Sequence, residues 1–170
     1  MLPVLDRSIP YVADGLQADP IGTSAATMRA ALRRHLLRLS TVDRIARFGG
    51  AMSDQAIEAY VERIDLDPAR LQVIYADDRE IVAIAELSPI HSETRPMAEV
   101  SFSVDALHRR RGLARDLLEG LLQAARARGF ACLHAQVCAG NASMLSVLRR
   151  AGMRFQREGS EWLGVLELRP

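Results

Sequence analysis

A short basic turn, His108 to Ala114, combines residue types suited to binding a phosphate group. It reads HRRRGLA, with three arginines directly before a glycine. Guanidinium groups are forked donors that match phosphate oxygens, and a glycine lets the backbone approach a ligand closely. Positive charge at the start of a helix is unfavourable unless an anion is bound there. The turn therefore predicts a phosphate-binding loop, with a solvated basic turn as the alternative.

The turn follows a predicted strand and opens a predicted helix. Residues 98–105 alternate between two faces, which is the period of a strand. Residues 112–128 place leucines at helical spacing up to a terminating glycine, and residues 131–138 have the pattern of a second strand. This strand–helix–strand order predicts that the two strands run parallel. The first strand has an apolar face (Val100, Phe102, Val104) and a polar face (Glu99, Ser101, Ser103).

The first half of the chain predicts helices. Residues 28–48 have helical spacing in two segments that end at a Gly-Gly pair. Ser40 is expected to cap the second segment, which contains Val42, Ile45 and Phe48. Ser53 is the expected N-cap of a further helix through residue 64.

Short apolar runs predict the remaining strands. The runs 71–76 and 80–87 flank Asp77-Asp78-Arg79, which predicts a β-hairpin, and a loop with Pro89 and Pro96 is expected to follow. Near the C-terminus we predict a helix over 142–151, capped by Asn141, and strands over 153–158 and 162–168. The total predicts an α/β fold.

Composition limits the class of protein. The 170 residues fit one domain, which we place at residues 26–170 after an arm of residues 1–25 that is punctuated by proline and glycine. The net charge of +1 and the 5% aromatic content argue against nucleic acid or a membrane as partners. All 22 basic residues are arginine, which excludes Schiff-base and P-loop lysines.

The two cysteines indicate a reduced setting. Cys132 and Cys138 lie in one predicted strand, roughly 20 Å apart along it, which is too far for a disulfide between them. No signal-peptide pattern and no membrane-length apolar run is present in the sequence. We therefore expect a cytoplasmic protein and no metal centre.

Two motifs resemble those of the GNAT N-acetyltransferase family. Arg109-x-x-Gly112-x-Ala114 is similar to the family's pyrophosphate loop, [Q/R]-x-x-G-x-[G/A], and lies as expected after a strand. The segment from Asn141 to Gly152-Met153 resembles the family's "N … GF" segment, with Met153 in place of phenylalanine. The upstream LSTVDRIARF … AIEAYVERID is similar to the bacterial protein-acetylating branch.

The resemblance implies a fold and a cofactor. The GNAT fold has a mixed, mostly antiparallel sheet of six to seven strands, flanked by helices, with a central βαβ unit that binds acetyl-CoA. Carried over onto this sequence, the loop wraps the pyrophosphate, two strand residues pair their backbones with pantetheine, and one asparagine faces the pantetheine arm. The implied cofactor-binding residues are Phe102, Val104, Arg109, Arg110, Arg111, Gly112, Leu113, Ala114, Arg115 and Asn141.

The catalytic expectation centres on one carboxylate. Glu99 lies on the polar face of the strand before the loop, where the similar branch has an acidic residue, and we expect it to act as the general base. A solvated surface carboxylate is the alternative reading of Glu99, and Glu86 is the next candidate base. Many family members place a tyrosine as general acid seven residues after the asparagine, but Leu148 stands there.

The implied reaction is transfer of an acetyl group from acetyl-CoA to a primary amine by direct attack in a ternary complex. The acceptor is either a protein lysine or a small-molecule amine. A non-catalytic acetyl-CoA-binding sensor is the alternative function, which the missing tyrosine would explain. The sequence does not determine the oligomeric state, and both a monomer and a homodimer are compatible with it.

Overall fold

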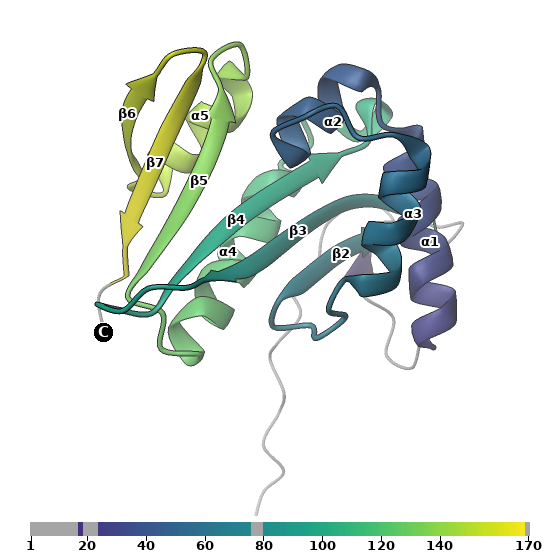
Figure 1. The fold of residues 1–170 in the computed structure, drawn as a ribbon, viewed down its shortest axis with the longest axis horizontal. Coiled ribbons are helices and arrows are strands. Elements are labelled where there is room, and N and C mark those ends of the chain that lie inside the picture. The colour runs from purple at the N-terminus through teal and green to yellow at the C-terminus, as the bar shows by residue number, and fades with distance from the viewer. Residues whose placement is uncertain (1–16, 19–23, 76–79, 169–170) are drawn as a thin grey trace, which may run out of the picture.

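A single twisted sheet organises the structure (Figure 1). The computed structural model describes residues 17–18, 24–75 and 80–168. Within that part, seven strands lie in the order β1-β2-β3-β4-β5-β7-β6, and every neighbouring pair is antiparallel except β4 and β5. The strands are β1 (Gln17–Ala18), β2 (Leu71–Tyr75), β3 (Ile81–Ile90), β4 (Met97–Val104), β5 (Cys132–Cys138), β6 (Arg154–Glu158) and β7 (Glu161–Glu167).

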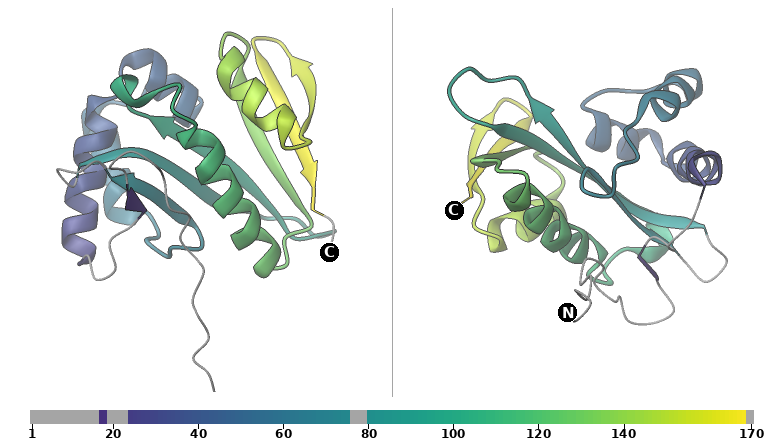
Figure 2. Two further views of the ribbon diagram at one scale, coloured as in Figure 1. Left: turned by 180° about the vertical axis from the view of Figure 1, so that it is seen from behind. Right: turned by 90° about the horizontal axis from the view of Figure 1, so that it is seen from below.

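Helices cover both faces of the sheet (Figure 2). Helices α1, α2 and α3 lie on one face and α4 and α5 on the other, so that two separate groups of buried apolar side chains form. The helices are α1 (Ala25–Arg38), α2 (Thr41–Phe48), α3 (Asp54–Arg63), α4 (Leu113–Ala127) and α5 (Ala142–Arg150), with a 3₁₀ turn η1 (Ala106–His108). The predicted α/β fold with a mixed, mostly antiparallel sheet is confirmed.

Local sequence signals explain most helix ends. The hydroxyl groups of Ser40 and Ser53 accept hydrogen bonds from backbone N–H groups in α2 and α3, as predicted. Helix α1 begins earlier than the apolar pattern indicated, because Ser24 caps it. The predicted arm lies largely outside the described residues, although Gln17–Ala18 pairs with β2.

The predicted loop around Pro89 is wrong, because β3 continues through Pro89 to Ile90. The Leu87 N–H bonds to the Arg70 carbonyl on the β2 side, and alternate residues of a strand point their N–H groups the same way. Pro89 therefore directs its nitrogen past the start of β2, where no neighbouring strand needs a donor. A proline is tolerated at such a free edge.

Helix α2 buries a different face from the one its apolar residues suggested. Val42 is 75% exposed and Ile45 is also exposed, whereas Arg47 in the last turn is only 7% exposed. Arg47 points to the polar side chains of β3 and β4, so hydrogen bonding and not apolar burial determines how this short helix lies on the sheet.

The parallel strands β4 and β5 stay together over only part of their length. Their ladder contains three residue pairs, from Met97 with Cys132 to Glu99 with His134. Beyond Glu99 the two strands diverge, as Figure 1 shows. The predicted parallel pairing of these two strands is confirmed, and it is limited to this short ladder.

A buried histidine ties α1 to the same sheet. His35 is 1% exposed, and its Nδ1 lies 3.0 Å from the Ile81 carbonyl oxygen while its Nε2 lies 2.8 Å from the Ser103 hydroxyl. Because a carbonyl only accepts, Nδ1 carries the proton and Nε2 accepts from Ser103. Burial is the main cause that lowers the pKa of His35 to about 4, so the ring is neutral near pH 7.

Gly164 gives a first test of the packing. A Cβ at Gly164 would lie 2.5 Å from the Met153 sulfur and 2.5 Å from the Phe155 ring, which crosses the glycine from β6. Gly164→Ala should therefore lower the free energy of unfolding by about 1–3 kcal/mol, as measured by urea denaturation. Gly140→Ala is the matched control, since a Cβ there meets nothing within 4 Å. A Gly164→Ala variant as stable as the control would contradict this packing.

The buried imidazole predicts an acid limb in the stability curve. Between pH 6.5 and about 4 the unfolded chain protonates His35 and the folded chain does not, so stability is full above pH 6.5 and falls as the pH drops. The total loss attributable to His35 is about 3 kcal/mol. His35→Asn should flatten the urea midpoint between pH 6.5 and 4, whereas substitution of the exposed His91 should not. An unchanged slope in His35→Asn would rule out this linkage.

Candidate active site

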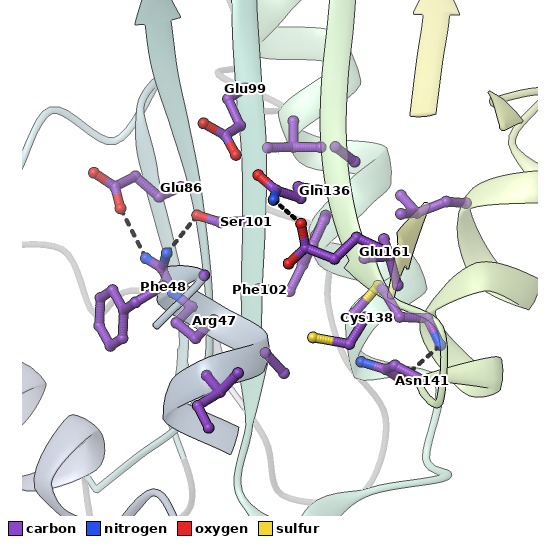
Figure 3. Close-up of a pocket in the computed structure, with 18 of the residues that line it drawn as sticks. Arg47, Phe48, Glu86, Glu99, Ser101, Phe102, Gln136, Cys138, Asn141 and Glu161 are labelled. Carbon is purple, nitrogen blue, oxygen red and sulfur yellow. Dashed lines mark hydrogen bonds and ion pairs between the residues drawn. The ribbon is translucent and has the colours of Figure 1, made fainter. Parts of the chain in front are cut away.

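A cavity of about 250 Å³ lies where β4 and β5 separate (Figure 3). Residues of α2, α3, β3 and β4 line one side, and residues of β5, β7 and α5 line the other. The wall is largely polar, and it includes three of the glutamates, Glu86, Glu99 and Glu161, together with Arg47. Side chains far apart in the sequence are thus brought to one opening by the divergence of the strands.

Glu99 projects into this opening from β4 (Figure 3). Its side chain is exposed, and no ion pair to it is found among the described residues. Its neighbour across the β3–β4 ladder is the uncharged Ser88. An exposed carboxylate with no cation against it is free to accept a proton from a ligand.

Glu86 has a different environment from Glu99. Its carboxylate accepts a hydrogen bond from Arg47 at 2.7 Å and another from the Tyr60 hydroxyl. Arg47 also donates to the Tyr60 hydroxyl and to Ser101, and its guanidinium lies over the Phe48 and Tyr60 rings. Burial raises the pKa of Tyr60, so the phenol stays protonated as a donor. The charge of Glu86 is therefore compensated within the protein.

The backbone of β4 faces the gap at the residues named from the sequence. The Asp105 N–H bonds to the Val82 carbonyl of β3, so residues two apart from Asp105 also direct their backbone groups to β3. Phe102 and Val104 lie at the intervening positions and direct theirs toward β5, which has already diverged. The Val104 carbonyl accepts from Arg109 Nε at 3.2 Å. The edge at Phe102 is open to an extended ligand.

The arginine turn leads into α4 without a side-chain cap. Serine or asparagine caps the other described α-helices, but α4 begins at Gly112 with no such hydrogen bond. The first N–H groups of a helix have no partner within the helix, so those of Gly112, Leu113 and Ala114 can bind an anion. Arg110 and Gly112 both have positive φ, at 62° and 87°, which gives the turn its tight curvature.

The arginines of this turn differ in their partners. Arg109 forms a 2.6 Å ion pair with Asp43 of α2, which fixes its side chain away from the helix start. Arg110 and Arg111 are exposed and have no carboxylate partner in the described part of the chain. Arg115 lies along α4 near Asp116. Two uncompensated guanidinium groups therefore flank the free N–H groups.

The cavity wall formed by β5, β7 and α5 contains Asn141 and Leu148, two positions singled out in the sequence. The Asn141 side chain caps α5 by accepting from Met144 N–H, and it also lines the cavity. Leu148 is 1% exposed and belongs to the apolar core, so no proton donor stands at that position. Figure 3 shows the Cys138 sulfur directed into the opening and Glu161 bonded to Gln136. Cys132 is buried, and both cysteines are free thiols, as expected.

Sequence reasoning missed Arg47, Tyr60, Gln136 and Glu161. Tyr60 lies within the predicted helix that Ser53 caps, and Arg47 lies in a helix whose apolar residues pointed to another buried face. The one available signal was an arginine between alanine and phenylalanine, which is too common to use. No group of three potential metal ligands occurs among the described residues. Nor is any helix in those residues long and apolar enough to cross a membrane.

Comparisons with known proteins agree with this architecture. The GNAT domain of S. lividans PAT is 24% identical, with 90% of each chain covered and a TM-score of 0.68. The ribosomal-protein-S5-alanine acetyltransferase from Vibrio fischeri is 12% identical, covering 94% of this chain and 98% of that one, with a TM-score of 0.71. A putative acetyltransferase from Salmonella typhimurium, solved with its cofactor acetyl-CoA, is 16% identical, with coverages of 92% and 95% and a TM-score of 0.63. No curated protein gives a significant match.

The structural likenesses, all below 25% identity, establish the fold. A family model adds a match over residues 35–153, which is more than half of the chain and includes β4, the arginine turn, α4, β5 and α5. The predicted family is therefore confirmed, and the chain belongs to the acetyltransferase (GNAT) family.

Proposed function

We propose that this protein transfers the acetyl group of acetyl-CoA to a primary amine, with Glu99 as the general base. The observation that carries the proposal is the coincidence of an uncompensated carboxylate with the gap between β4 and β5. Family membership supports acetyl transfer, and similar structures have been solved with acetyl-CoA or CoA. The acceptor is a protein lysine or a small-molecule amine.

The arrangement of the chain suits acetyl-CoA. The free N–H groups from Gly112 to Ala114, with Arg110 and Arg111, would hold the pyrophosphate. The open edge at Phe102, with the Val104 N–H beside it, would pair with the pantetheine arm and direct the thioester carbonyl toward β4, while the Val104 carbonyl is bonded to Arg109. Arg109, held by Asp43, would contribute through its backbone. Leu113 and Arg115 belong to the same first helical turn, and Asn141 would face the arm from α5.

The proposed chemistry needs a proton acceptor that converts the ammonium form of the substrate to a neutral amine. An amine is mostly an ammonium near pH 7, and a cavity lined by Glu99 and Glu161 attracts that form. Glu99 removes the proton, directly or through water, and the neutral nitrogen attacks the thioester carbon. The new N–C bond forms as the C–S bond breaks, the nitrogen loses its second proton to water, and the sulfur leaves as a thiolate. Because Leu148 offers no proton, the start of α5 is the nearby positive dipole that can stabilise this charge.

Glu99 is preferred to Glu86 as the base for an electrostatic reason. The carboxylate of Glu86 is already held by Arg47 and Tyr60, so a proton taken up there would break both interactions. Glu99 has no such partners in the described residues and is exposed to the cavity. A proton can reach it without a loss of existing contacts.

The phosphate site is tested by Gly112→Asp. A carboxylate at the start of α4 should repel the pyrophosphate, and its Cβ should obstruct the close approach of the backbone. We expect CoA affinity, measured by calorimetry, to fall at least about tenfold. Gly129→Asp is the control, because Gly129 also has a positive φ and open surroundings but lies beyond the other end of α4. Equal CoA affinity in the two variants would contradict the assignment of the pyrophosphate site to this turn.

The base is tested by Glu99→Gln with release of free thiol from acetyl-CoA as the readout. With an active acceptor from a panel of amines and proteins, kcat/KM should fall by about 10²-fold or more while CoA binding persists. Glu158→Gln on the exposed strand β6 is the matched control. Thiol release by Glu99→Gln at the control's rate would refute the assignment. CoA binding without thiol release across the whole panel would instead favour the acetyl-CoA-binding sensor.

A further inference from the structure

The three cavity glutamates occupy unequal electrostatic positions. Glu86 and Glu99 lie on the same face of the sheet, because Glu86 pairs with Ser101 across the β3–β4 ladder while Ser88 pairs with Glu99. They are thus diagonal neighbours, separated by roughly 7 Å between their backbones. Both side chains line the same cavity (Figure 3). Two free carboxylates at this spacing would repel one another.

Arg47 prevents that repulsion. Its side chain is 4% exposed and lies 2.7 Å from the Glu86 carboxylate, and its guanidinium lies 5.0 Å and 5.9 Å from the centroids of the Phe48 and Tyr60 rings. Burying an arginine has a large desolvation cost, which an ion pair with further hydrogen bonds offsets. Glu86 supplies the opposite charge, and Ser101 and the Tyr60 hydroxyl accept two more hydrogen bonds, while Nε has no hydrogen-bond partner among the described residues. The pair has no net charge, although its two halves belong to α2 and β3.

We propose that the Arg47–Glu86 pair is a positioning device that keeps Glu99 the single uncompensated carboxylate on the β3–β4 side of the cavity and thereby sets the pH at which it accepts protons. The proposal rests on the proposed function, in which Glu99 is the base. Arg47 does not contact the reacting atoms in this scheme. It acts by cancelling the charge of Glu86 and by fixing the end of α2 over the sheet.

The other titratable groups near Glu99 are not replaced in the Arg47 and Glu86 variants described below. His134 is its partner across the β4–β5 ladder, and Tyr60 faces the cavity from α3 as a neutral phenol. Glu161 lies on the β7 side and is bonded to the neutral Gln136. Tyr60 loses one hydrogen bond in either variant but stays an uncharged phenol, and His134 and Glu161 are not replaced, so a change in the titration of Glu99 reports the charge of the pair.

The two halves of the pair make opposite predictions. Arg47→Gln leaves Glu86 as an uncompensated negative charge, which should move the titration midpoint of Glu99 upward. Glu86→Gln leaves Arg47 as an uncompensated positive charge, which should move it downward. A unit charge roughly 7 Å away, at an effective dielectric constant of about 20, changes a midpoint by about 1.7 pH units. The double variant Arg47→Gln/Glu86→Gln should return close to the wild type.

The experiment is a ¹³C NMR titration of glutamate side chains in the free protein, with the Glu99 signal assigned by its loss in Glu99→Gln. The acid limb of kcat/KM for thiol release should shift in the same directions. Arg44→Gln is the control, because Arg44 is also in α2 but pairs with Asp54 away from the cavity. Its Glu99 midpoint should match the wild type.

Opposite shifts that cancel in the double variant would support the proposal, since structural damage cannot change sign between the two single variants. Shifts of the same sign, absent shifts, or a double variant that stays displaced would overturn it. The base assignment fails separately: a Glu99→Gln variant that releases thiol at the wild-type rate would reject Glu99 as the base, whatever the NMR titration shows.

Discussion

The short parallel ladder between β4 and β5 is the constraint on which the site depends. Three residue pairs hold the strands together, and the ladder then stops in the middle of β4. Backbone groups that a longer ladder would have used face an open gap, and unpaired groups of this kind bind an extended ligand well. The same divergence opens the cavity that Glu99 enters. One interruption of the sheet therefore creates both the open strand edge and the cavity on which the proposed function depends.

Two apolar groups, one on each face, hold the sheet where it diverges. One apolar group packs α4 and α5 against the sheet, and the other packs α1 and α3 against β2 and β3. His35 links α1 to β3 and β4 through two hydrogen bonds, so β4 is held from the side opposite α4. The far half consists of β5, β7 and β6, which pair continuously. The apolar group under α4 and α5 contains residues of β3 and β4 as well as of β5 and β7, so it joins the two halves on that face.

The positive charge of the side chains in this protein is carried by arginines, and the structure uses their guanidinium groups in two ways. At the α4 start, Arg110 and Arg111 have no carboxylate partner among the described residues and lie beside free N–H groups, which favours an anion. In the cavity wall, Arg47 is buried and forms an ion pair with Glu86. The first arrangement leaves charge available to a ligand, while the second removes charge from the neighbourhood of Glu99. Arginine suits both because its planar fork bonds in several directions at once.

The extent of sequence-based prediction differs between local and distant features. The serine caps, the β4–α4–β5 order and the polar face of β4 were predicted, because each depends on residues close together in the chain. The path of β3 through Pro89 was not, because the end of β2 determines whether that nitrogen needs a partner. The burial of Arg47 was not either, since three partners from β3, β4 and α3 outweigh the apolar spacing of an eight-residue helix.

By itself the sequence determined the family, the order of elements and the turn that opens α4, since these follow from periodicity and from motifs within short stretches. Only the tertiary structure decided which carboxylate is free. Glu86 and Glu99 have similar sequence surroundings, each an acidic residue in a strand beside apolar neighbours. Their difference arises from Arg47, about forty residues before Glu86, which forms an ion pair with Glu86 and not with Glu99. Electrostatic compensation acts through space, and a pattern along the chain does not contain it.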